Sequence, residues 1–155
     1  IYKKCSEGYK MRVLVQRALS SSVTVDNEVI GRIDKGAVLL VGFTEGDNSD
    51  TIDYMVNKVL NLRIYDDSNG VMNKSILDVG GSILSISQFT LYANSKKGNR
   101  PSYINALNGE KAISLYEEFN NKLSRYICVE TGKFGADMLV DIKNDGPVTI
   151  MLERE

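Results

Sequence analysis

The sequence contains no histidine among its 155 residues. Histidine is the usual general base of nucleophilic hydrolases and the commonest protein ligand of transition metals. Its absence excludes Ser-His-Asp and Cys-His catalysis and removes the usual basis for a transition-metal site. We therefore predict no metal and no cofactor, and any catalysis must use other groups.

Cysteines and long apolar runs are scarce as well. Cys5 and Cys128 lie far apart and form no closely spaced pair, which argues against a disulfide framework or a zinc site. No apolar run approaches the roughly 20 residues that span a bilayer. Residues 1–10 lack the apolar segment and cleavage site of a secretory signal. We expect a cytoplasmic protein with no membrane partner.

Neither sign of charge is in large excess, since the net charge is -1 and the pI is near 5.6. Broad, non-specific binding to nucleic acid depends on neutralising many phosphates, so this class is disfavoured. A local basic patch is still compatible with the composition. The best one is the polar loop 93–105, which contains Lys96, Lys97 and Arg100.

The length and the hydrophobic pattern predict one domain with one core. Period-two alternation and continuous apolar runs predict strands, and three-and-four spacing predicts two helices. We expect an α/β fold, with α+β as the alternative, and a largely antiparallel, barrel-like sheet. The expected strands are residues 11–18, 22–26, 28–33, 36–43, 83–92, 127–130, 138–143 and 148–152, and the expected helices are 49–63 and 109–125.

The segment Asn144–Thr149 lies between the last two predicted strands. Its Asp-Gly pair is typical of a hairpin turn, because glycine reaches positive φ without a steric penalty. Pro147 cannot donate to a strand ladder, and an X-Pro bond is the only kind in which a cis peptide costs little. The simplest interpretation from these residues alone is a hairpin that stops at a proline.

A second polar cluster, Ser87–Thr90, ends the strand predicted over residues 83–92. Strand hydroxyls such as those of Ser87 and Thr90 usually bond to backbone or water. Gln88 more simply satisfies a buried backbone group, although an amide can also serve an oxyanion hole. Phe89 is most simply a core residue. Thr90 as a nucleophile has no adjacent base in this sequence.

Seven segments in one order resemble the D-aminoacyl-tRNA deacylases, also called D-tyrosyl-tRNA deacylases. The resemblance runs from Met11 to about Leu152, so residues 1–10 are interpreted as an N-terminal extension and residues 11–155 as the deacylase domain. The segments are Met11–Arg17, Ser22–Val25, Asn61–Arg63, Ser87–Tyr92, Lys97–Ser102, Gly132–Met138 and Asn144–Thr149.

The resemblance implies hydrolysis of the ester between a D-amino acid and the 3′-terminal ribose of tRNA, a proofreading reaction. Glycyl-tRNA is the expected secondary substrate. The resemblance further implies a homodimer in which Gly146 and Pro147, joined by a cis bond, enter the partner's active site. Their carbonyls would hold the substrate's α-amino group, and the backbone would exclude an L side chain.

The same resemblance assigns roles to other residues. Ser87, Gln88, Phe89 and Thr90 would form the opposite, catalytic side of the site. Arg17 would brace the Gly-Pro segment, and Phe134 and Met138 would bind substrate. The tRNA end would be held by Lys96, Lys97 and Arg100.

Two catalytic schemes are compatible with this resemblance. In one, the hydroxyl of Thr90 is the nucleophile; in the other, the terminal ribose 2′-hydroxyl activates water while the protein positions and polarises the ester. The sequence favours the second scheme, because the motif around Thr90 offers no histidine and no acid. Two other classes stay open: a non-catalytic dimeric module that binds a tRNA end, and a serine or threonine hydrolase of small esters.

Overall fold

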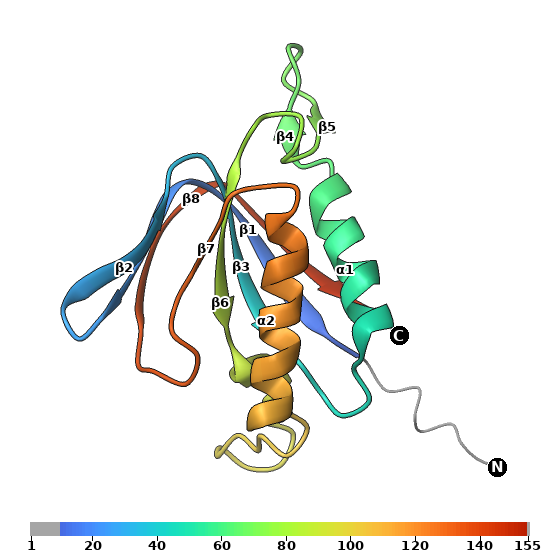
Figure 1. Ribbon diagram of the computed structural model, residues 1–155, viewed down its shortest axis with the longest axis vertical. Coiled ribbons are helices and arrows are strands. Elements are labelled where there is room, and N and C mark those ends of the chain that lie inside the picture. Colours follow the sequence, from blue (N-terminus) through green and yellow to red (C-terminus); the bar gives the residue numbers. More distant parts are fainter. Residues whose placement is uncertain (1–9, 155) are drawn as a thin grey trace.

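A computed structural model describes residues 10–154 of the chain (Figure 1). Of the predicted N-terminal extension, all but Lys10 lies outside the described residues. The elements follow the chain in this order: β1 (Arg12–Val25), β2 (Glu28–Ile33), β3 (Gly36–Gly42), α1 (Ser49–Asn61), β4 (Tyr65–Asp66), β5 (Met72–Lys74), β6 (Ser82–Ser87), a 3₁₀ helix (Phe89–Tyr92), α2 (Glu110–Ser124), β7 (Val129–Thr131) and β8 (Leu139–Glu153).

Strand β1 organises the main sheet because it pairs with three other strands. On one edge it pairs antiparallel with β3 along its first half and with β2 along its second half. On the other edge β8 runs antiparallel to it over almost its whole length. The predicted alternation is present, since Val13, Val15 and Arg17 are all buried on one face. The strands expected over residues 11–18 and 22–26 are two halves of this one element.

The sheet is mixed: the three pairings of β1 are antiparallel, as predicted for most of the sheet, but two further pairings are parallel, which the sequence did not predict. Strands β3, β6 and β7 run parallel to one another. The parallel connections are possible because α1 and α2 provide the crossovers that such pairs need. Strand β2 curls back until it contacts β6 and β7, so the sheet forms a nearly closed barrel. The barrel-like part of the prediction is therefore correct.

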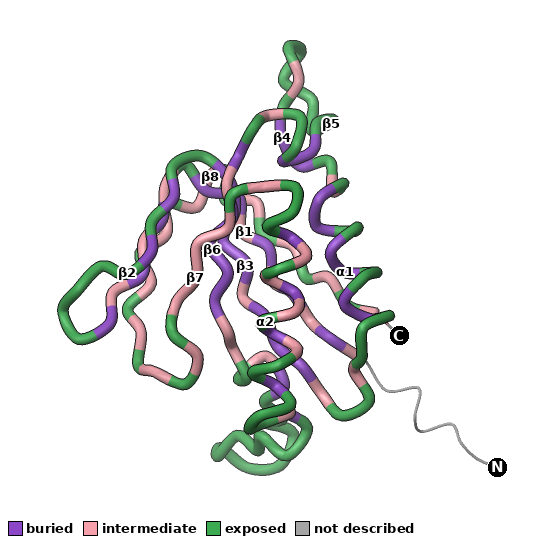
Figure 2. The backbone as a smooth tube through the Cα atoms, viewed as in Figure 1, coloured by how far each residue is buried: buried purple, intermediate pink, exposed green. Residues whose placement is uncertain are grey.

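Both helices lie side by side against one face of this sheet (Figure 1). Helix α1 begins with a capping box, in which the Asn48 side chain accepts from the N–H groups of Asp50 and Thr51. The apolar stripes of the helices pack on the sheet and form the larger core cluster, while a smaller cluster fills the curled part of the sheet. Figure 2 shows the buried chain concentrated in the central strands and on the inner faces of both helices.

Strand β6 ends earlier than the sequence predicted. Residues Ile83 to Ile86 are buried without interruption, because the helices cover one face of this strand and the curled sheet covers the other. After Ser87 the chain turns into the 3₁₀ helix, which begins as the Gln88 N–H donates to Val41 O (2.7 Å). The strand predicted over residues 83–92 is thus correct only to Ser87.

The approach of β3 to β6 is unusually close at one end. A Cβ on Gly36 would lie 1.8 Å from the carbonyl oxygen of Ser82, so only glycine fits at this position. The hydroxyl of Tyr65 donates to the Gly36 carbonyl (2.8 Å), and burial raises the pKa of Tyr65 well above its usual value.

Residues 10–154 contain no helix long and apolar enough to cross a membrane.

Candidate active site

A cavity of about 380 Å³ opens where β3 and β6 end side by side. The carboxyl ends of neighbouring parallel strands are the usual location of ligand sites in such sheets. The start of α2 and the segment 134–140 close the cavity from other sides. Five of the residues predicted for the site line this cavity, namely Ser87, Gln88, Phe89, Phe134 and Met138.

Tyr116 of α2 contacts residues beside this cavity, and the sequence did not predict a role for it. Its hydroxyl donates to the Ser85 carbonyl of β6 (2.7 Å), and its ring lies 5.9 Å from the ring of Phe134. Burial raises the pKa of Tyr116, so the phenol stays protonated and remains a donor. No sequence pattern indicates this role, because a tyrosine in the apolar stripe of α2 is also typical of a core residue.

Thr90 lies on the 3₁₀ helix beside Gln88, and the Gln88 Nε2 donates to the Thr90 hydroxyl oxygen. A hydroxyl becomes a strong nucleophile when a neighbouring base takes its proton. Gln88 does the opposite, because it donates a hydrogen to the oxygen that would have to attack. Thr90 itself is exposed and does not line the cavity.

Phe89 is not a core residue, which corrects the simplest interpretation of its sequence context. Its side chain is 48% exposed, and it lies on the 3₁₀ helix rather than on a strand. The ring contacts that of Tyr103 edge to face, with 5.1 Å between centroids. Phe89 thus joins the cavity to the base of the loop that carries Lys96, Lys97 and Arg100.

The Gly146–Pro147 segment is a bulge inside β8 and not a hairpin turn. Gln16 pairs with Thr149 and Ala18 pairs with Asn144, so two steps along β1 match five along β8. The extra residues leave the ladder and expose this dipeptide, whose peptide bond is cis. The hairpin interpretation was therefore wrong, because β8 continues along β1 after the bulge.

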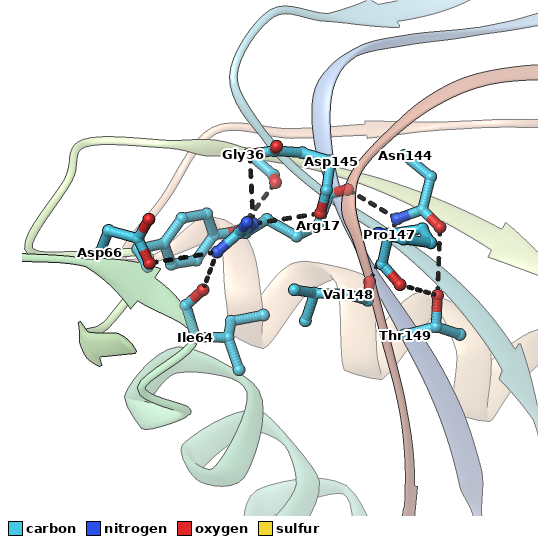
Figure 3. A network of polar contacts seen from close by, with 10 residues as sticks. Arg17, Gly36, Ile64, Asp66, Asn144, Asp145, Pro147, Val148 and Thr149 are labelled. Atoms are coloured by element: carbon cyan, nitrogen blue, oxygen red, sulfur yellow. Dashed lines mark hydrogen bonds and ion pairs between the residues drawn. The ribbon is translucent and has the colours of Figure 1, made fainter. Parts of the chain in front are cut away.

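The side chain of Asn144 closes the base of this bulge (Figure 3). Its Nδ2 donates to the carbonyls of Arg17 (2.9 Å) and Val148 (3.1 Å). Its Oδ1 accepts from the Thr149 hydroxyl (3.1 Å) and from Gln16 Nε2 (3.4 Å). One amide thereby ties both ends of the bulge to each other and to β1.

Arg17 supports the bulge from beneath (Figure 3). Its Nη1 donates to Ile64 O (2.7 Å), and its Nε donates to Asp145 O (3.3 Å). The guanidinium also pairs with the carboxylates of Asp145 (3.2 Å) and Asp66 (3.7 Å). A buried guanidinium with four contacts to three residues holds together the bulge, the link between α1 and β4, and β4 itself.

A family model described as D-Tyr-tRNA(Tyr) deacylase matches residues 14–153. The chain belongs to this family. The D-aminoacyl-tRNA deacylase of Clostridium kluyveri is 54% identical over 146 residues, which cover 94% of this chain and 98% of the relative. That of Bacteroides fragilis is 55% identical over 145 residues, which cover 92% and 97%.

Two solved structures are similar to this chain. The structure of a c-Myc DNA Unwinding Element Binding Protein superposes with a TM-score of 0.88 at 40% identity, covering 93% of this chain and 99% of that one. A "probable eukaryotic D-amino acid tRNA deacylase" superposes with a TM-score of 0.80 at 16% identity, over 94% and 100% of the two chains. The second likeness shows a shared fold.

In this member of the D-Tyr-tRNA(Tyr) deacylase family, a single chain does not bring all the predicted site residues together. Arg17 pairs with Ala37 near the beginning of β3, whereas the cavity is lined by Gly42 at its end. Ala37 and Gly42 are five residues apart along β3, which corresponds to roughly 16 Å in a strand. Arg17 and the Gly146–Pro147 bulge therefore lie at one end of the sheet, and Phe134 and Met138 lie at the other.

The remaining predicted residues form an exposed loop near the cavity end of the sheet. Lys96, Lys97 and Arg100 are all solvent-exposed, and residues 94 and 102 pair at the base of their loop. Within the described part of the chain, no group of three or more carboxylate or cysteine side chains is placed to hold a metal ion.

The Arg17 contacts predict how a substitution at this position would affect the Gly146–Pro147 bulge. Arg17→Lys should lower the free energy of unfolding by about 1.5–3 kcal/mol, because lysine cannot replace the forked, charged hydrogen bonds. Hydrogen exchange at the amides of residues 145–148 should speed up more than exchange in β3. Arg32→Lys, at an exposed position on β2, is the matched control and should change stability by less than about 0.5 kcal/mol. Equal effects from the two variants would contradict the bracing role.

Proposed function

We propose that this protein hydrolyses the ester bond between a D-amino acid and the 3′-terminal ribose of tRNA. The observation that carries the proposal is the family match over residues 14–153, together with relatives more than 50% identical that are named D-aminoacyl-tRNA deacylases. The cavity at the ends of β3 and β6 is the proposed site of hydrolysis. This reaction would release free tRNA from a mischarged one. The cytoplasmic location expected from the sequence stays a prediction.

The proposed active site is completed by a second copy of the chain. In a symmetric dimer, the Gly146–Pro147 bulge of one subunit would enter the cavity of the other, and the same exchange would form a second site. Two features support this arrangement. The bulge is exposed and rigidly braced, and it lies too far from the cavity of its own chain to act there.

Backbone groups are suited to selecting the D enantiomer. Among the described residues that line the cavity, the one carboxylate is that of Asp137, which would attract the ammonium of either enantiomer. The carbonyls of Gly146 and Pro147, held at a fixed position, would anchor the ammonium and leave no room for an L side chain. Glycine has no side chain to exclude, so glycyl-tRNA is the expected secondary substrate.

The proposed chemistry uses backbone donors and the RNA itself. Phe89 and Thr90 provide the first N–H groups of the 3₁₀ helix, and such groups have no partner inside their own helix. They would polarise the ester carbonyl as an oxyanion hole does. The terminal ribose 2′-hydroxyl would then activate water, because Thr90 has a donor beside it and no base.

The first experiment compares the two enantiomers on the same tRNA. Purified protein should release D-tyrosine from D-Tyr-tRNA at least about a hundredfold faster than it releases L-tyrosine from L-Tyr-tRNA, which corresponds to about 2.8 kcal/mol of discrimination. Release of radiolabelled amino acid is the measurement, with buffer alone as the control. Binding of both tRNAs without turnover would instead support the non-catalytic tRNA-end-binding module.

A second experiment separates the two catalytic schemes. Thr90→Ala should keep kcat on D-Tyr-tRNA within about tenfold of the parent, whereas a 2′-deoxy terminal adenosine should lower kcat by about a hundredfold or more, as expected for loss of an acid-base group. Single-turnover hydrolysis is the measurement. Abolished activity in Thr90→Ala, together with cleavage of a free small ester, would establish the threonine hydrolase instead.

A further inference from the structure

An exposed pair of aromatic rings lies at the mouth of the cavity. Phe89 is 48% exposed, Tyr103 is 39% exposed, and the adjacent Ile104 is 84% exposed. The two rings meet edge to face, and Phe89 also lines the cavity. A continuous apolar surface therefore leads from the proposed site of hydrolysis out to Tyr103.

The loop that presents this surface is firmly anchored at its base. Asn94 and Ser102 exchange two backbone hydrogen bonds of 2.8 Å, and the Lys96 N–H donates to the Asn94 side chain (3.0 Å). Beyond Tyr103, the Leu107 N–H donates to the carbonyl of Phe43 at the end of β3 (2.9 Å). The ring of Tyr103 is thus held at a defined place beside Phe89.

The charged side chains of the loop that carries Tyr103 all have one sign. Residues 93–109 contain Lys96, Lys97 and Arg100 and no acidic residue, although the whole chain has a net charge of -1. A polyanion with exposed flat rings matches this combination of cations and aromatic side chains. The same loop from a second copy of the chain would match it poorly, because the cations would repel each other.

We propose that Phe89 and Tyr103 form a stacking platform for the unpaired nucleotide that precedes the esterified terminal adenosine of tRNA. The inference rests on the proposed function, because the ester in the cavity fixes which nucleotide reaches the rings. The terminal adenosine enters the cavity, the preceding base stacks on the ring pair, and the phosphates pass toward Lys96, Lys97 and Arg100. Unpaired bases are commonly bound in this way by exposed aromatic side chains.

Two substrates that share the ester and differ in the RNA test this platform. One is D-Tyr-tRNA, and the other is D-tyrosyl-adenosine, which has no preceding nucleotide. The measurement is the ratio of kcat/KM for the tRNA to kcat/KM for the adenosine ester. Tyr103→Ala should lower this ratio about five- to a hundredfold, as expected for loss of stacking on one base.

Two matched variants serve as controls. Tyr103→Phe keeps the ring and should keep the ratio of the parent protein. Tyr126→Ala removes a more exposed tyrosine, 64% exposed beyond the far end of α2, and should also leave the ratio unchanged. Thermal unfolding and sedimentation equilibrium of each variant establish that the fold and the oligomeric state are intact.

The outcomes distinguish this inference from the proposed function. If the parent protein hydrolyses neither substrate, the proposed function fails. If the parent is active and Tyr103→Ala lowers both kcat/KM values equally or neither, the platform is overturned. A change in oligomeric state with Tyr103→Ala would likewise overturn it, because the rings would then be a contact between protein subunits.

Discussion

The buried guanidinium of Arg17, in the middle of β1, joins strand β8 to the link between α1 and β4. Arg17 occupies a position that the alternation of the strand reserves for apolar side chains, so its charge must be compensated inside the protein. The carbonyl of Ile64 and the carboxylate and carbonyl of Asp145 provide that compensation. Because Ile64 lies in the link that follows α1 and Asp145 lies in β8, Arg17 fixes the Gly146–Pro147 bulge relative to the chain that leaves this helix.

In the proposed site, the bulge and the cavity provide different groups. Among the described residues, the cavity is lined by apolar side chains and by one carboxylate, that of Asp137, which would attract the ammonium of either enantiomer. The bulge exposes the Gly146–Pro147 backbone, which Arg17 and Asn144 hold in place. With no histidine in the chain, we propose that backbone geometry selects the enantiomer and that the RNA substrate supplies part of the chemistry. Side chains such as Arg17, Asn144 and Tyr116 act by positioning backbone.

The sequence predicted the parts of the fold that depend on local patterns. Helix α1 was correct to within two residues at its end because it has both a cap and a regular apolar stripe. Long-range features were missed. Strand β6 is buried on both faces, so its alternation carried no information, and the parallel pairing with β3 depends on crossovers that no short pattern records. An Asp-Gly-Pro segment is compatible with both a hairpin turn and a bulge, so its sequence alone does not distinguish them.

The candidate site was predictable in composition but not in arrangement. The family resemblance identified Ser87, Gln88, Phe89, Phe134 and Met138, and the structure gathers these five around one cavity. No local pattern could show that Phe89 is exposed against Tyr103, because Tyr103 lies just outside the segment Lys97–Ser102 and was not singled out by charge or by resemblance. The separation of the bulge from the cavity likewise follows only from the register of β1 with β3.

In the proposed dimer, each active site combines the cavity of one subunit with the Gly146–Pro147 bulge of the other. Ala136→Trp would fill the cavity, and Gly146→Ala would distort the bulge, because the added Cβ would lie 2.8 Å from the Val148 side chain. Each variant alone should lack D-Tyr-tRNA hydrolysis. A hybrid of one subunit of each, purified through two different affinity tags, should recover about half the parent activity, since one of its two symmetric sites is intact. A hybrid as inactive as both variants would contradict the claim.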